Sequence, residues 1–255
     1  MFRAVALGIV MAAGVAAAQS PAASFEVATI KPVDPGPQAG RFLRMENDHR
    51  FLATNFTLKL LIAAAYDLNP RTITGGPGWT DSDKFTIEAL TPGEKRPDHD
   101  QQMLMLRTLL HDRFHLAFHR VPKVFSIYEI TVAKGGVQFD TAGAPNREPM
   151  VTSVVYPDHL EMPARNASMD DFARVMQRAI LDRPVVNKTG LTGRYDFDLD
   201  WAPDETQFGG AIPVPQDSKS PPLLVAMREQ LGLEMKATRG PIDTLVIDKA
   251  DKPEN

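Results

Sequence analysis

The chain has 255 residues, of which 43% are hydrophobic and 24% charged, so it can build a packed core and is not a disordered chain. A net charge of −4 without a run of Lys and Arg excludes the electrostatic signature of nucleic-acid or membrane-surface binding. The absence of cysteine excludes disulfides and lipid-modified cysteine.

The N-terminus has the composition of a signal peptide. Met1–Arg3 carries a positive charge, Ala4–Val15 is apolar but too short to cross a bilayer, and Ala16–Ala18 offers small residues for cleavage after Ala18. We therefore predict residues 1–18 to be a cleaved signal peptide. The mature chain is expected to be secreted or periplasmic, without membrane insertion.

The first half of the mature chain alternates strand and helix signals. Phe25–Lys31 alternates as a strand does, Pro32–Gly40 favours a turn, and Arg41–Thr54 is typical of a hairpin. In Asn55–Leu58 (NFTL) a hydroxyl residue stands where it can cap a helix, and Gly78–Phe85 (GWTDSDKF) indicates a turn followed by a strand.

The second half repeats these signals in the same order. Asn166–Met169 (NASM) matches the first capping stretch, and Gly190–Phe197 (GLTGRYDF) matches the turn and strand without a gap. Each half then continues with one helix and two strand-like runs. The helices are predicted at Gln102–Leu110 and Leu223–Leu231, and the strand pairs at Phe114–His119 with Phe125–Ala133 and at Leu233–Thr238 with Thr244–Asp248.

These elements predict an α+β fold of two tandem, duplicated βαββαβ-like modules, in which helices cover one face of small mixed sheets. Chance similarity of two ordinary α+β stretches is the alternative. The first module spans residues 25–139 and the second 150–253, joined by a linker at 140–149 that is rich in Gly, Pro and polar residues. Residues 203–222 contain five prolines and Gly209–Gly210, which predicts a mobile loop.

The second half contains four short motifs, Arg183–Val186 (RPVV), Gly193–Phe197 (GRYDF), Gln230–Leu233 (QLGL) and Leu245–Asp248 (LVID). In these motifs it resembles the short N-terminal domain of secretins and TonB-dependent receptors. This resemblance implies a β-α-β-β-α-β order, and it extends to the first half through the repeat.

A second set of motifs extends over nearly the whole chain and comprises Phe25–Pro32 (FEVATIKP), Gly75–Trp79 (GGPGW), Asp112–Phe114 (DRF), Lys188–Phe197 (KTGLTGRYDF) and Lys252–Asn255 (KPEN). Through these motifs the chain resembles the "Soli" family of exported acidobacterial proteins of unknown function. This resemblance implies no catalytic residues. Similar domains attached to membrane metallopeptidases of the β-lactam-sensor type imply a sensing or interaction role outside the cytoplasm.

Four residues are our candidates for binding. Trp79 follows a glycine-rich turn, where an aromatic side chain can serve as a ligand platform or partner anchor, although burial over the sheet is the favoured alternative. Arg113, Arg194 and Tyr195 lie within the motifs that carry the family resemblance.

Two metal sites were considered and not predicted. His111, His115 and His119 would share one face of a continuous helix and could bind zinc, but the residues after His111 alternate as in a strand, where His115 and His119 lie ~13 Å apart. Asp196, Asp198 and Asp200 place three carboxylates on one strand face. They lack the spacing of a calcium loop, and an exposed charged face explains them as well.

Two apparent catalytic motifs also have simpler explanations. Ser82 and Lys84 lack the context that would form an oxyanion hole around a serine-lysine dyad. Gly75–Gly78 lacks the lysine of a phosphate loop and precedes Trp79 and a strand rather than a helix, so we expect a tight turn.

We therefore expect a non-enzymatic protein without cofactor or metal. Its partner is predicted to be a protein or peptide of the cell envelope, bound by adding a strand to an exposed sheet edge. One alternative is an envelope hydrolase that uses His115, His119 and Asp196; another is small-molecule binding between the two modules. The sequence leaves open whether the modules form one continuous sheet.

Overall fold

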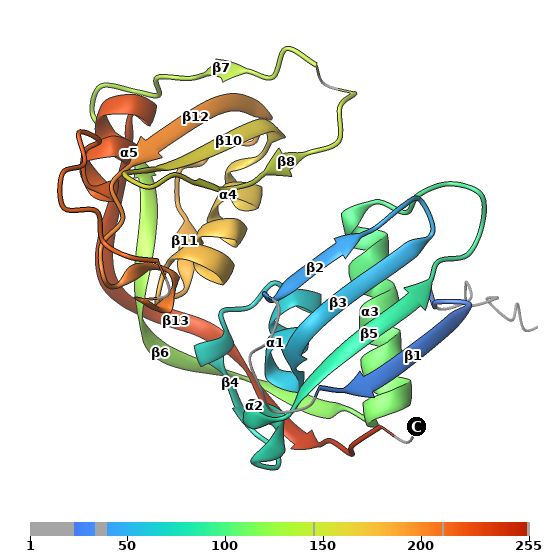
Figure 1. Ribbon diagram of the computed structural model, residues 1–255. Helices are drawn as coiled ribbons and strands as arrows, with labels where there is room; N and C mark the ends of the chain where they lie inside the picture. Colours follow the sequence, from blue (N-terminus) through green and yellow to red (C-terminus); the bar gives the residue numbers. More distant parts are fainter. Residues whose placement is uncertain (1–22, 34–39, 145, 211, 254–255) are drawn as a thin grey trace, which may run out of the picture.

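The computed structural model describes residues 23–33, 40–144, 146–210 and 212–253, arranged as two lobes joined by a long pair of strands (Figure 1). The predicted signal peptide at residues 1–18 and most of the predicted turn at Pro32–Gly40 lie outside the described residues. The predicted α+β class is confirmed.

The first lobe is an antiparallel sheet in the order β1-β5-β3-β2, covered on one face by helices. Its strands confirm the strand predicted at the start of the mature chain and the hairpin after it. The elements are β1 (Val27–Pro32), β2 (Phe42–Met45), β3 (Arg50–Thr57), α1 (Leu58–Ala65), η1 (Pro70–Thr72), α2 (Trp79–Ser82), β5 (Lys84–Leu90) and α3 (His99–Phe114).

The second lobe has the same layers, with a sheet in the order β7-β12-β10-β8 and β9 paired to β10. The elements are β7 (Asp140–Thr141), β8 (Met150–Val151), β9 (Val154–Val155), β10 (Leu160–Ala167), α4 (Met169–Val175), the π-helical turn η2 (Met176–Ile180), β12 (Tyr195–Trp201), η3 (Gln207–Gly210) and α5 (Leu223–Leu231). β7 falls within the segment predicted as a linker.

Helices α1 and α4, which follow β3 and β10, begin in the same way in the two lobes. Thr57 caps α1 by accepting from the Leu60 backbone N–H, and Ser168 caps α4 by accepting from the Asp171 N–H. Both hydroxyl caps were predicted. Each lies beyond a bulge where an asparagine, Asn55 or Asn166, has a positive φ. A common origin of the two halves by duplication stays a prediction.

The two halves share a third sheet, in the order β11-β6-β13-β4. The predicted modules therefore have separate sheets of their own and one sheet in common. β6 and β13 pair antiparallel along almost their whole length, and each receives a short parallel strand from the opposite half. The elements are β4 (Ile73–Gly75), β6 (Ala117–Val132), β11 (Val185–Asn187) and β13 (Leu233–Lys249).

The shared sheet contributes to both hydrophobic cores. Leu245 and Ile247 at the end of β13 are buried in the first core, and Ile130 of β6 is buried in the second. Because each half supplies residues to the other's core, we expect the lobes to fold as one unit.

The prediction of two short strands after each helix was wrong, because β6 and β13 are single long strands. Pro122 and Pro241 suggested breaks, since proline cannot donate a ladder hydrogen bond. β11 reaches β6 only at Tyr128–Ile130, and β4 reaches β13 only at Leu245–Ile247. Both prolines therefore lie where their strand has one open edge, which tolerates proline.

Two boundaries also differ from the prediction. Phe114, predicted to begin a strand, is the last residue of α3, and β6 begins at Ala117. Trp79 begins the one-turn helix α2, where the sequence predicted a turn leading directly into a strand. Among the helices of the described residues, none has the length and apolar composition needed to cross a membrane.

Candidate functional site

The lobes meet at α1 and η1 of the first lobe and the π-helical turn η2 of the second. Gln177 connects them: its side-chain amide donates to the Asp67 carbonyl at 2.7 Å, and its backbone carbonyl accepts from Asn69 Nδ2 at 2.9 Å. Its Oε1 also accepts from the Val185 N–H within its own lobe, at 3.2 Å. The turn is therefore fixed to both lobes.

Two cavities of about 540 and 550 Å³ adjoin this contact, and both share His99, Glu148 and Arg178 as lining residues. We call the two together the interlobe cleft. Volumes of this size suit a small molecule or a short peptide segment.

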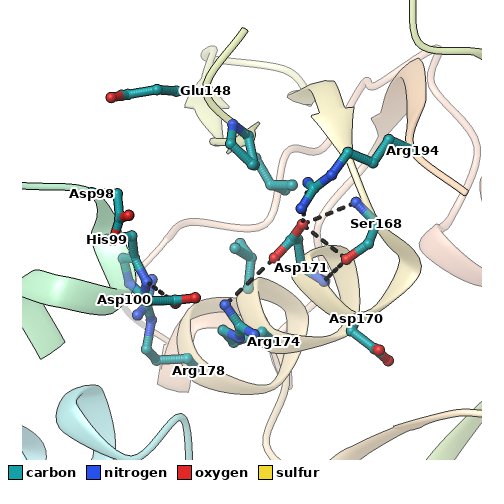
Figure 2. A pocket seen from close by; sticks show the side chains of 13 residues that line it. Asp98, His99, Asp100, Glu148, Ser168, Asp170, Asp171, Arg174, Arg178 and Arg194 are labelled. Carbon is teal, nitrogen blue, oxygen red and sulfur yellow. Dashed lines mark hydrogen bonds and ion pairs between the residues drawn. The ribbon is translucent and has the colours of Figure 1, made fainter. Parts of the chain in front are cut away.

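The polar part of the cleft lies between the N-terminus of α3 and α4 (Figure 2). Asp171 stands between two arginines, 3.4 Å from Arg174 Nη1 and 3.4 Å from Arg194 Nη1 (Figure 2). Arg174 also contacts Asp67 of the first lobe at 3.5 Å, and Arg194 donates to the Asn166 carbonyl at 2.8 Å. These arginines are therefore held by partners within the protein.

The second part of the cleft is lined mainly by apolar side chains and arginines. Its apolar residues come from β2, β3, α1, η1, η2 and η3, and its arginines from β2 and the residue before it, η2 and the loop before α3. The residues are Arg41, Phe42, Leu43, Arg44, Met45, Phe56, Leu60, Ala63, Ala64, Pro70, Arg96, His99, Gln102, Glu148, Arg178, Ala179 and Phe208.

Arg178 of η2 differs from Arg174 of α4. No carboxylate of the described residues lies within ion-pair distance of it, and Asp67 is the acidic group that acts on it from further away. Burial lowers the pKa of Arg178, Asp67 opposes this effect, and Arg174 adds to it. Because arginine stays protonated in proteins, a partly desolvated positive charge faces the cleft.

β2 meets the cleft along its edge. Five consecutive residues, Arg41–Met45, line the cavity, whereas a cavity on one face of a strand would be lined by alternate residues. Within the described chain β2 pairs only with β3. The Glu46 N–H donates to the Arg50 carbonyl, so by the alternation of antiparallel pairs the backbone groups of Leu43 and Met45 point away from β3.

The four predicted binding residues do not form one site. Trp79 packs over the first core against Phe114, and Arg113 donates to the Ala28 carbonyl at 3.1 Å. Tyr195 packs against Phe139 in the second lobe. Arg194 alone lines the cleft. No local sequence pattern singles out β2 or Arg178, because the cleft forms from segments far apart in the chain.

The histidines considered for zinc are each next to an aspartate. His111 lies 2.8 Å from Asp112, His115 lies 3.3 Å from Asp251, and His119 lies 2.8 Å from Asp248. In the part of the chain that the structure describes, His, Asp and Glu side chains form no cluster of three that could hold a metal ion.

The aspartate row on β12 has partners along β10. Asp196 accepts from the Asn166 and Gly143 N–H groups, Asp198 pairs with Arg165 at 2.7 Å, and Asp200 lies 3.3 Å from His159. The alternating residues Phe197, Leu199 and Trp201 are buried, as the strand pattern predicts. Asp196 belongs to a different sheet from His119, so the hydrolase candidates are not brought together.

The remaining motifs have structural contacts. Ser82 donates to Asp83 rather than to Lys84, and Asp83 pairs with Lys252 at 2.6 Å, which lowers the pKa of Asp83. Gly75 and Gly76 have positive φ, and a Cβ on Gly75 would lie 2.7 Å from the Ile247 carbonyl oxygen. The glycines thus form the turn that leaves β4 beside β13.

Comparison with known proteins gives a family of unknown function. No curated protein and no solved structure matches the chain. The resemblances to the exported acidobacterial family and to secretin-type short domains stay predictions. A family model described as "Protein of unknown function (DUF3738)" matches residues 59–250, so the chain belongs to this uncharacterised family.

Proposed function

We propose that this protein is an exported, non-enzymatic binding protein, which holds a peptide segment of an envelope partner in the interlobe cleft. The peptide adds to the edge of β2 that faces away from β3, which no strand of the described residues occupies, as a further antiparallel or parallel strand. Export rests on the sequence of residues 1–18, and the mode of binding rests on the cleft.

The edge of β2 is the observation that carries this proposal. Leu43 and Met45 direct backbone groups away from β3, and the same residues line a cavity large enough for a peptide. An extended peptide would satisfy these groups with main-chain hydrogen bonds, while its side chains enter the apolar part of the cleft. A small molecule could fill the same volume, but it would not pair with the backbone of the four strand residues Phe42–Met45.

A peptide array tests the proposal. Synthetic peptides with alternating apolar and polar residues are incubated with the mature protein, and the binders are measured in solution by fluorescence polarisation. Leu43→Pro removes an N–H that points away from β3. Because the Leu43 side chain packs against the first core, we expect this variant to fold cooperatively with a modestly lower melting temperature and to lose peptide affinity.

Ala28→Pro is the matched control. By the same antiparallel alternation, Ala28 points its backbone groups away from β5 on the opposite edge strand β1, and its carbonyl indeed accepts from Arg113. This variant should bind peptides as the wild type does. The proposal would be overturned if the wild-type protein bound no peptide of the array, or if Leu43→Pro and the wild type bound peptides equally well.

A further inference from the structure

The charges in the cleft point to the chemistry of the ligand, in an inference that rests on the proposed function. Four arginines, Arg41, Arg44, Arg96 and Arg178, line the apolar part of the cleft, together with His99. Glu148 is the one carboxylate among the lining residues there. The apolar part of the cleft is therefore cationic on balance, whereas the polar part adds the carboxylates Asp98, Asp100, Asp170 and Asp171 to Arg174 and Arg194.

Arg178 is the cation best placed to recognise a ligand. It lies in the π-helical turn, where both cavities meet, and no acidic side chain of the described residues pairs with it. Arg174, one turn earlier, is held by Asp67 and Asp171 instead. A π-helical turn is an irregularity that often occurs at functional sites.

Gln177 fixes the position of this arginine. Its three hydrogen bonds, to Asp67, Asn69 and Val185, attach the turn to both lobes. Because the backbone of the turn is fixed, only the side chain of Arg178 has to be ordered when it binds an anion, which favours affinity.

Apolar side chains surround the cationic position. Phe56, Leu60, Ala63 and Ala64 come from the first lobe, and Phe208 comes from the second. We propose that the cleft selects peptides that carry a carboxylate beside apolar side chains, and that Arg178 binds this carboxylate. The carboxylate is either the C-terminus of the peptide or an Asp or Glu side chain. An arginine can bind either one through two parallel N–H···O bonds.

Neutralised peptides test this inference. A peptide identified on the array is compared with its C-terminal amide and with versions that replace Asp by Asn and Glu by Gln. We expect one of these changes to weaken binding to the wild type by roughly 10- to 100-fold. The neutralised position that weakens binding identifies the source of the carboxylate. The same neutralisation should have little effect on the affinity of the Arg178→Gln variant.

Two further variants separate recognition from folding. Arg178→Lys keeps the charge but not the planar fork, so its affinity should lie between those of the wild type and Arg178→Gln. Arg239→Gln makes the same charge change at an exposed residue outside the cleft and should bind as the wild type does. Melting temperatures measured by circular dichroism show whether each variant is folded.

The outcomes distinguish this inference from the proposed function. If peptides bind but neither neutralisation nor Arg178→Gln weakens them, the inference is wrong and the proposed function stands. If no peptide binds, the proposed function fails as well. Equally tight, Arg178-dependent binding of a long-chain fatty acid, tested in parallel, would show that the ligand needs no peptide backbone and would overturn the peptide part of the proposal.

Discussion

The two lobes have the same layers but present different features to the cleft. The first lobe offers β2, a continuous edge strand whose free side lines the cavity. In the second lobe the edge strands at the position of β2 are β8 and β9, which pair with β10. Each is only two residues long, and Thr152–Ser153 separates them. Broken edges of this kind resist pairing with another chain. The second lobe instead contributes Arg178, which lines both cavities, whereas Arg41, Arg44 and Arg96 of the first lobe line only the apolar part.

Phenylalanine truncations in the two cores should have the largest effects. Phe51 and Phe172 are fully buried, and replacing either by Ala should cost about 3–5 kcal/mol of unfolding free energy. Because the lobes share the β6–β13 sheet, we expect a truncation in one lobe to destabilise the other equally.

Trp201 can report on the second lobe alone in a Trp79→Phe background, since the chain has two tryptophans. Adding Phe51→Ala in the first lobe should move the Trp201 fluorescence transition and the circular dichroism transition to the same lower denaturant concentration. An unchanged Trp201 midpoint would instead mean that the lobes unfold independently.

Substitutions at the C-terminal caps of α3 and α5 should change the free energy of unfolding in opposite directions. Both end in the left-handed region, at His115 with φ 46° and at Gly232 with φ 64°. A Cβ on Gly232 would lie 1.9 Å from the Gly136 carbonyl oxygen, so Gly232→Ala should lose at least about 2 kcal/mol. His115→Gly removes the strain and should gain about 0.5–1 kcal/mol.

Urea denaturation of both cap variants measures these changes. The exposed contact of His115 with Asp251 contributes little to stability, so its loss should not reverse the gain. A loss of stability in His115→Gly would show that this histidine has a role beyond capping.

Acid should affect the second lobe through Asp196, at the position where the first lobe has Lys84. Hydrogen bonds from the Asn166 and Gly143 N–H groups lower the pKa of Asp196. The ionised carboxylate therefore stabilises the fold above its unfolded pKa of about 3.9, and this stabilisation is lost as the pH falls through the lower, folded value. Denaturation midpoints of the wild type and Asp196→Asn should differ at neutral pH and converge in acid; a constant difference would contradict this assignment.

Local signals in the sequence predicted the lobes well, because caps and alternation depend on neighbouring residues. Thr57, Ser168 and the buried face of β12 are examples. The long strands were missed because proline at an open edge resembles a break. Arg178 was missed because its significance comes from the absence of an acidic partner, which depends on where α4 and η2 pack against the first lobe.

Hydrogen exchange with a bound peptide tests the central claim most directly. A saturating peptide should slow exchange of the Leu43 and Met45 amides, which point into the cleft, and should leave the outward Ala28 amide of β1 unchanged. Unchanged exchange at Leu43 and Met45 while the peptide is bound would contradict strand addition at β2.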